Sequence, residues 1–351
     1  MNTTATLKDQ WRDLIQTEPG LRIRNAAAKL GVTEAELLAT RVGEDVTLLK
    51  PEFQEILNEI ESLGKVMALT RNNEVVHERK GEYLNPTLDN PHVGLFVGDD
   101  IDLRIFFASW KFAFAVTDDN GRMKRQSIQF FANDGEAIHK IYLTDKSDEN
   151  AYQKLIEKYK ANEQKSSIVV EPKKEKEAET PDSEIDVESF REDWVNLEDT
   201  HHFFGLLKKH KLARKQALRL APEGEYVSKM DKDAIKSILQ KAVENNVSIM
   251  VFVGNKGMIQ IHTGVIKKLL ERGPWYNVMD PDFNLHINMD GIVDAWVVRK
   301  PTEDGMVTAI ECFNKDEDQV VQFFGKRKPG IPELESWRDI VSEVESEHKL
   351  S

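Results

Sequence analysis

Two related halves make up this sequence, and the duplication constrains the fold more than any other feature. Trp11 in DQWRDLIQTEP matches Trp194 in EDWVNLEDTHH, 183 positions later, and Arg104 in DIDLRIFF matches His286 in DFNLHINM, 182 positions later. The segments IQFFANDGEAIHKIY and IECFNKDEDQVVQFF match in the same way, 182 positions apart. A nearly constant offset of this length indicates duplication of a whole domain, because solenoid repeats recur about every 20–50 residues instead.

A charged segment separates the two halves. Residues 163–186 contain EQKSS and EPKKEKEAETPDSE, with few large apolar residues apart from 168–170. A charged run that also contains proline cannot bury enough apolar area to order itself, so we expect a flexible, solvated linker. The predicted domains are an N-terminal repeat over 1–162 and a C-terminal repeat over 187–351.

Each half begins with helical patterns and continues with strand patterns. In the first half, apolar residues recur at three- and four-residue spacing up to residue 63 and alternate in short runs afterwards. The helices expected there are Leu7–Ile15, Arg22–Leu30, Glu34–Thr40, Pro51–Leu63, Gly135–Thr144 and Ala151–Tyr159. The expected strands are Gly64–Thr70, Glu74–Arg79, His92–Val97, Asp102–Ala108, Lys111–Asp118 and Ser127–Phe131. Helices followed by a meander of strands predict the α+β class with a largely antiparallel sheet.

The composition argues against several classes of function. The 48 basic and 61 acidic residues give a net charge of −13, which repels phosphate backbones and disfavours nucleic-acid binding. The single cysteine, Cys312, excludes an intramolecular disulfide and a cysteine-cluster metal site, and we expect it to be buried and inert. No stretch approaches the ~20 apolar residues of a membrane span. We therefore expect a cytoplasmic protein without membrane insertion.

The halves differ most informatively after the Trp194 helix. Where the first half reads TEP, the second reads THHFF. His201 lies seven residues after Trp194 and four after Leu197, so a continuous helix would place it on their apolar stripe. His202 would then point about 100° away. A histidine on an apolar helix face is often a hydrogen-bonded core residue, and it is also a candidate metal ligand.

Positive charge gathers in the second half where the first half is acidic. Residues 208–219 carry six Lys or Arg and no acidic residue, and Arg214 stands where the first half has Glu34. Further basic pairs are Arg299–Lys300, opposite Asp118–Asp119 of the first half, and Lys326–Arg327. Each pair alone is typical of a solvated surface. Beside an apolar-face histidine they favour a ligand with a flat apolar body, carboxylates and a metal centre, which are the properties of heme.

Other histidines and motifs are less informative. We expect His210, nine residues after His201, at a solvated surface, with a heme-transfer site as the alternative. His77, in VVHERKGEY, is expected to complete a turn, with a second heme site as the alternative. No HExxH, CxxC or GxGxxG signature occurs, so zinc-protease and Rossmann interpretations have no support.

Several long segments, in order along the chain, resemble one known family. In the second half these are THHFFGLLKKHKLARKQAL, MVFVGNKGMIQIHTGV, LHINMDGIVDAWVVRKPTEDG and QFFGKR; in the first they are VHERKGEYL and LRIFFASWKFAF. They look like the bacterial hemin-degrading factor family of the HemS/ChuS/HmuS type, over essentially the whole chain except the linker. The resemblance implies a tandem duplication in which each half has a large antiparallel β-sheet flanked by helices. It also implies that one heme (iron protoporphyrin IX) binds in the C-terminal repeat, with a reach from the N-terminal one.

The resemblance also implies roles for individual residues. His201 takes the place of the axial iron ligand, and Arg104 takes that of an arginine covering the opposite heme face, so both are candidate catalytic residues. The propionate-binding and porphyrin-contacting positions fall on Arg214, Lys300, Arg327 and Phe252. The chain departs from the family at Phe324, where several relatives have tyrosine, and a hydroxyl near a propionate is lost.

Two functions of different classes follow from this family. In one, the protein is an enzyme that opens the porphyrin and releases iron, using an external reductant such as NADPH. In the other, it is a carrier that delivers heme to a separate heme oxygenase. The sequence contains no nicotinamide or flavin motif. The expected partners are heme and, in the cell, a heme ABC transporter, a reductase or a heme oxygenase.

Overall fold

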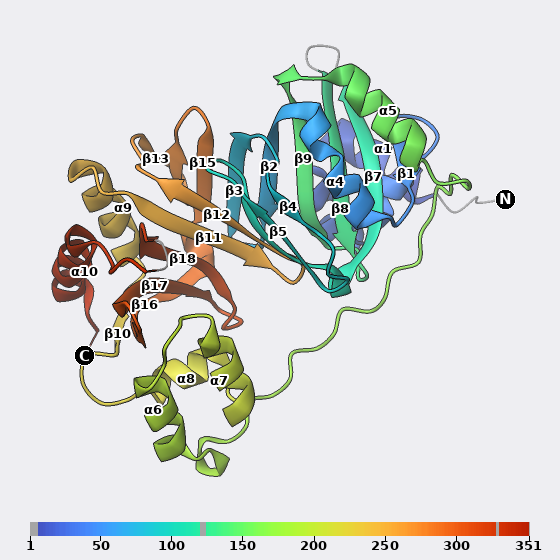
Figure 1. The fold of residues 1–351 in the computed structure, drawn as a ribbon. Coiled ribbons are helices and arrows are strands. Elements are labelled where there is room, and N and C mark those ends of the chain that lie inside the picture. Colours follow the sequence, from blue (N-terminus) through green and yellow to red (C-terminus); the bar gives the residue numbers. More distant parts are fainter. Residues whose placement is uncertain (1–5, 120–123, 328–329, 351) are drawn as a thin grey trace. The chain divides into compact units, whose positions relative to one another are not determined.

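The structure, a computed structural model, describes residues 6–119, 124–327 and 330–350 (Figure 1). The chain divides into two compact units. Unit 1 comprises Met1–Arg71, Glu78–Lys174 and Gly254–Gln260, and unit 2 comprises Asn72–His77, Glu175–Val253 and Ile261–Ser351. Each unit therefore consists mainly of one half of the chain and includes one short segment of the other.

The first half has short helices before its strands and one helix after them. Its helices are α1 (Leu7–Thr17), α2 (Ile23–Leu30), α3 (Glu34–Ala39), α4 (Phe53–Asn58) and α5 (Glu149–Tyr159). Its strands are β1 (Val46–Leu49), β2 (Gly64–Arg71), β3 (Val75–Gly81), β4 (Pro86–Thr87), β5 (Val93–Val97), β6 (Asp102–Phe106), β7 (Trp110–Asp119), β8 (Lys124–Ala132) and β9 (Ala137–Ser147). Helices α1 and α3 begin with capping boxes at Thr6 and Thr33, which satisfy otherwise unpaired backbone N–H groups.

The second half repeats this order. Its helices are α6 (Val187–Val195), α7 (His202–His210), α8 (Arg214–Arg219), α9 (Ala234–Glu244) and α10 (Glu335–His348). Its strands are β10 (Val227–Met230), β11 (Ile249–Asn255), β12 (Met258–Gly264), β13 (Leu269–Arg272), β14 (Trp275–Met279), β15 (Phe283–Asn288), β16 (Ile292–Thr302), β17 (Gly305–Asn314) and β18 (Gln319–Gly325).

The strands form two nine-stranded sheets of the same plan. The strand order is β1-β7-β8-β9-β2-β3-β15-β14-β13 in one sheet and β10-β16-β17-β18-β11-β12-β6-β5-β4 in the other. Neighbours such as β7 and β8, or β16 and β17, pair antiparallel. Replacing each strand of one sheet by its counterpart in the other half gives the other sheet. This confirms the α+β class, the antiparallel sheets and the duplication.

One expected element is wrong. The predicted helix Gly135–Thr144 is the strand β9 (Ala137–Ser147), and its first five residues, 137–141, are all buried. A strand covered on both faces shows continuous burial instead of alternation, so its sequence resembles a buried helix. The expected helix Pro51–Leu63 is also divided, into α4 and a 3-10 helix over Ile60–Leu63.

The charged segment 163–186 has no strand and no α-helix before α6, apart from a 3-10 turn over Asp182–Glu184. Hydrogen bonds nevertheless hold it at both ends. The Gln164 side chain pairs with both backbone groups of Leu48, and Gln216 Nε2 donates to the Thr180 carbonyl at 2.6 Å. The flexibility of the middle of this segment stays a prediction. Within the three described ranges, no helix is both long and apolar enough to cross a membrane.

In the second sheet, the strands β10, β16, β17, β18 and β11, which belong mainly to unit 2, have two differently covered faces. One face packs with α9 and α10 in a core that includes Val251, Phe323 and Cys312. Cys312 is fully buried, as expected, and burial raises its thiol pKa. The opposite face packs through Trp296 and Val298 against α6, α7 and α8, which form one group of short helices in Figure 1. This helix-covered face carries most of the residues singled out in the second half.

Candidate functional site

His201 does not continue the Trp194 helix, so the predicted apolar-stripe position is wrong. Helix α6 ends at Val195, and His201 is the residue that precedes α7. Trp194 is fully buried, whereas 85% of the His201 side chain is exposed. The Asp199 carboxylate accepts a hydrogen bond from the His201 backbone N–H at 2.8 Å, and such local side-chain bonds compete with helix formation.

The imidazole of His201 is oriented by the same carboxylate. Nδ1 lies 2.6 Å from Asp199 Oδ1, so the ring donates its Nδ1–H there and leaves Nε2 as the nitrogen that could bind a metal. The backbone and side-chain hydrogen bonds from His201 hold the pKa of Asp199 below its usual range. Metal-binding histidines commonly have a carboxylate at the second nitrogen. Sequence reasoning missed Asp199, although an Asp two residues before a candidate ligand is a usable signal.

An open apolar surface adjoins His201 on α7. Phe204, three residues later, is 68% exposed, and the space beside Gly205 is empty to at least 4 Å. The Lys208 ammonium lies 5.9 Å from the centre of the Phe204 ring. Exposed aromatic residues that adjoin a polar ligand group often mark a binding surface. This face of α7 therefore combines a candidate metal-ligand nitrogen, an aromatic ring and open space beside Gly205.

Close to α7, the predicted site residues Arg214 and Lys300 both donate hydrogen bonds to Glu311, which is not among the residues predicted from the sequence. Arg214 donates from Nε and Nη2 to the two oxygens of Glu311, both at 2.7 Å, and Lys300 Nζ donates to Oε1 at 2.8 Å. Gln319 Nε2 completes the set at 2.7 Å from Oε2. The Phe203 ring lies 4.3 Å from the Lys300 ammonium. We call Arg214, Lys300 and Glu311 the second-half ion cluster.

Burial and charge oppose one another in this cluster. Burial lowers the pKa of Lys300 to about 8, against the raising effect of Glu311. Burial also disfavours the charged form of Glu311, but the charges of Arg214 and Lys300 outweigh it and hold that pKa at about 2. At neutral pH the cluster therefore carries two cations and one anion, and its net charge is positive.

Phe252 and Phe324 lie on the same sheet face as this cluster. Gln322 of β18 pairs with both Phe252 and Glu311 in register, and paired residues share a face. The rings of Phe252 and Phe324 are 5.0 Å apart, and both side chains are partly exposed. The sheet thus provides a half-open aromatic platform on the side that α7 and α8 cover elsewhere.

Arg327 and Arg104 form ion pairs with residues outside this cluster. Arg327 follows β18, and its guanidinium lies 3.7 Å from Asp304. Arg104 belongs to unit 1, where Nη1 pairs with Asp102 and donates to the Leu103 carbonyl at 3.2 Å. Asp102 lies on the same strand face, two residues away, and the other neighbours of Arg104 on that face are apolar and at least partly exposed: Val93, Leu95, Val97 and Phe106.

The structure changes the interpretation of two other histidines. His210 is not at a solvated surface: its side chain is 7% exposed, and Nε2 lies 2.6 Å from Asp193 Oδ2. His77 lies within β3, fully buried, with its ring 5.0 Å from that of Phe283, so it does not complete a turn. His202 is exposed, next to His201 at the start of α7.

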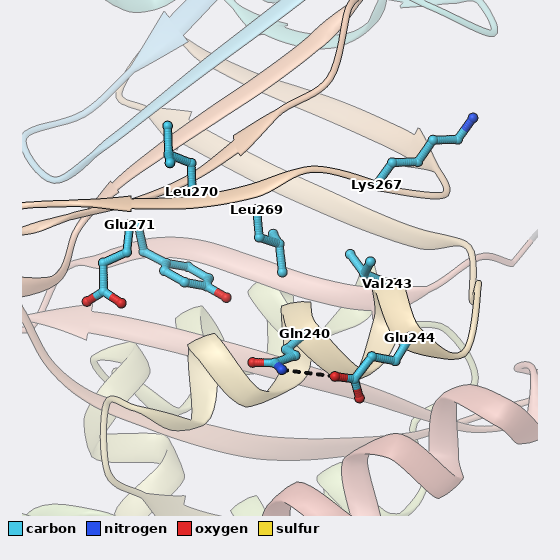
Figure 2. Close-up of a pocket in the computed structure, with 8 residues that line it drawn as sticks. Gln240, Val243, Glu244, Lys267, Leu269, Leu270 and Glu271 are labelled. Atoms are coloured by element: carbon cyan, nitrogen blue, oxygen red, sulfur yellow. Dashed lines mark hydrogen bonds between the residues drawn. The ribbon is translucent and has the colours of Figure 1, made fainter.

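A separate pocket of about 360 Å³ opens in unit 2 between α9 and the strands β13 and β14 (Figure 2). Its lining residues are Gln240, Val243, Glu244, Lys267, Leu269, Leu270, Glu271 and Tyr276. Gln240 donates to Glu244 at 2.9 Å across its floor. None of these described lining residues belongs to the set predicted from the sequence, and none of them is a histidine.

Comparisons with known proteins point to one family. The family model for the haemin-degrading HemS/ChuX domain matches residues 31–159 and 211–344. The hemin transport protein HmuS of Yersinia pestis is 37% identical over 344 residues, or 97% of each chain. The heme-binding protein PhuS of Pseudomonas aeruginosa, in its holo crystal structure, is 45% identical, with a TM-score of 0.93 over 95% of this chain and 96% of that one. The heme degrading enzyme ChuS of Escherichia coli O157:H7 is 36% identical, with a TM-score of 0.89 over 96% and 98%. The chain therefore belongs to the haemin-degrading HemS/ChuX domain family.

Proposed function

We propose that this protein binds one heme through unit 2, with His201 as the axial iron ligand, and degrades it to release iron. The observation that carries the proposal is the exposed imidazole of His201, held by Asp199 through Nδ1 beside the open face of α7. An imidazole locked in this tautomer leaves Nε2 as a ligand for iron. Relatives described as heme-binding and as heme degrading share this fold over almost the whole chain.

The other residues fit the remaining parts of heme. The partly exposed Phe204, Phe252 and Phe324 offer apolar contacts for the porphyrin. Arg214 and Lys300 supply positive charge for its carboxylates, and Arg327 adds a further guanidinium.

Arg104 is proposed to act on the face of heme opposite His201. Its guanidinium is permanently charged, and its strand face is apolar apart from Arg104 itself and its partner Asp102. Such a group can donate hydrogen bonds to a water or hydroxide near the iron without replacing the histidine. His201 and Arg104 are accordingly the proposed catalytic residues.

When bound and reduced, heme iron itself supplies the oxygen chemistry that opens the porphyrin. The protein then has to hold the iron, orient the macrocycle and exclude competing ligands. An external reductant such as NADPH, acting directly or through a reductase, is proposed to supply the electrons.

Heme carriage is the second candidate. A relative 37% identical over 97% of each chain is named a hemin transport protein. An exposed axial histidine suits transfer, because a partner can approach the metal without unfolding the site. In that role the protein would take heme delivered by an ABC transporter to a separate heme oxygenase in the cytoplasm.

A spectral time course separates the two functions. The heme complex would be incubated with ascorbate, or with NADPH and a reductase, with and without oxygen and with catalase present. Degradation predicts loss of the Soret band only in oxygen, with iron released to a chelator and an open-chain tetrapyrrole formed. An intact Soret band, together with transfer of heme to an added apo heme oxygenase, would refute the enzymatic proposal in favour of carriage.

A further inference from the structure

We infer that Glu311 is a positioning residue for the carboxylates of the ligand: it holds Arg214 and Lys300 in place and charged, so that the second-half ion cluster can accept a heme propionate. The inference rests on the proposed function and deepens it. Glu311 itself is fully buried and would not touch the porphyrin.

The geometry shows how one carboxylate organises two cations. Both oxygens of Glu311 accept hydrogen bonds from Arg214, and Oε1 accepts a second from Lys300. Arg214 is thereby held in a bidentate arrangement, which fixes the plane of its guanidinium. Among the described residues no acceptor pairs with its third nitrogen, Nη1, and 26% of the side chain is exposed. One guanidinium edge therefore remains for a carboxylate arriving from outside.

The charge balance explains why an additional anion fits. The charged groups that face Lys300 are Glu311 from β17 and Arg214 from α8. Helix α7 contributes the uncharged ring of Phe203, which also packs edge-on against Trp194 of α6. One anion between two cations leaves a positive cluster in a poorly solvated place, where a further carboxylate is favoured.

Without the Glu311 charge, Lys300 would lose its ammonium at neutral pH. Burial and Arg214 both lower its pKa, and Glu311 is what opposes them. In Glu311→Gln the pKa of Lys300 should fall below the present value of about 8. Because a lysine is charged only below its pKa, that variant should lose heme affinity at a lower pH than the wild type, in which Lys300 begins to lose its charge only near its pKa of about 8.

The test measures heme affinity of the full chain at pH 6.0, 7.0 and 8.0, for wild type, Glu311→Gln and the control Glu317→Gln, whose carboxylate is 40% exposed and lies 3.7 Å from Lys215. We expect Glu311→Gln to lose about tenfold at pH 8.0, as for one charge-assisted contact, and to recover most of it at pH 6.0. Heme dimethyl ester, which lacks free carboxylates, should bind all three proteins with one pH profile.

The outcomes separate this inference from the proposed function. No heme binding by wild type would overturn both. Wild-type binding with an unchanged pH profile in Glu311→Gln, or equal losses for heme and its ester, would overturn the role of Glu311 alone. If Glu311→Gln does not fold, the double variant Glu311→Gln/Lys300→Met removes both members of the pair and avoids an unpaired buried ammonium. It should bind heme weakly without the pH slope, and wild-type affinity in it would equally overturn the inference.

Discussion

Each half of the protein buries a cluster of one carboxylate and two cations, but the two clusters are built in opposite ways. In unit 1, Glu34 at the start of α3 is the carboxylate, and Arg71 and Lys140 come from strands. In unit 2, the residue at the start of α8 is the cation Arg214, and the carboxylate comes from a strand. The first cluster is sealed, with every side chain at most 12% exposed, whereas Arg214 is 26% exposed.

A second contrast concerns the three-stranded ribbons. On the outer face of β5 and β6, the ion pair of Arg104 and Asp102 is surrounded by the apolar residues Val93, Leu95, Val97 and Phe106. Its counterpart in β14 and β15 carries Asn277, Asn284, His286 and Asn288, with a 2.7 Å hydrogen bond between His286 and Asn277. Each half has a buried ionic cluster and a three-stranded ribbon, and the halves differ in how exposed the cluster is and in how apolar the outer face of the ribbon is. We propose that these differences between the halves are important for the function.

The largest expected effect is on stability and comes from the sealed cluster. Glu34→Gln would leave Arg71 and Lys140 buried without their anion, which should lower the free energy of unfolding by about 3–5 kcal/mol. Heme affinity should stay unchanged, because this cluster is closed to ligands. Denaturant unfolding and heme titration, with the exposed Glu44→Gln as the control, check both parts. If Glu34→Gln kept its stability but lost heme affinity, the cluster of unit 1 would serve ligand binding, which contradicts the roles assigned to the two clusters.

The next effect concerns the residue that orients the iron ligand. Asp199→Ala removes the acceptor at His201 Nδ1, so the ring can rotate and change tautomer. Loss of such an outer partner typically weakens metal binding by about 10–100-fold, and the lower end is expected at this exposed site. The neighbouring Glu198→Ala provides the control in the same titration. Equal affinities for the two variants would mean that Asp199 only shapes the turn before α7.

The next prediction concerns an aromatic position at which the two halves differ by one hydroxyl group. Phe324→Tyr gives the second half the tyrosine that the first has at Tyr142. One added hydrogen bond to a propionate contributes about 0.5–1.5 kcal/mol, so heme should bind roughly 2–10-fold more tightly. Tyr142→Phe should have no effect, and neither variant should alter binding of the dimethyl ester. Tighter ester binding by Phe324→Tyr would exclude the propionate as the partner of the hydroxyl.

The smallest change in affinity is expected at Arg104. Arg104→Ala should alter the pH-dependent absorption spectrum of ferric heme, because it removes a donor to water or hydroxide near the iron. Affinity should change less than in Phe324→Tyr. Spectra recorded from pH 6 to pH 10 for wild type, Arg104→Lys and Arg104→Ala provide the measurement. Superimposable pH titrations would exclude the first-half arginine from the heme environment.

Much of the fold could be predicted from the sequence, because the offset between Trp11 and Trp194 and the alternating strands depend on local pattern. Strand β9, which the sequence pattern predicts as a helix, shows the limit of such predictions, because a strand buried on both faces shows no alternation of apolar and polar residues. The same holds for the site. Arg214 and Lys300 stood out as charges that the first half lacks, but their meeting on Glu311 depends on strand register, which no local spacing reveals. In the break before α7, the Asp199 carboxylate accepts a hydrogen bond from the His201 backbone N–H, and the spacing from Trp194 alone cannot reveal this interruption of the helix.

The central claim is that His201 holds the iron of a heme bound to unit 2, and a paired substitution tests it most directly. Heme would be titrated into wild type, His201→Ala and His202→Ala, following the Soret band and the low-temperature electron paramagnetic resonance of the ferric complexes. We predict one heme per chain in the wild type, more than about 100-fold weaker binding with loss of the histidine-ligated signal in His201→Ala, and near wild-type behaviour in His202→Ala. Unchanged affinity and spectra in His201→Ala would contradict the account.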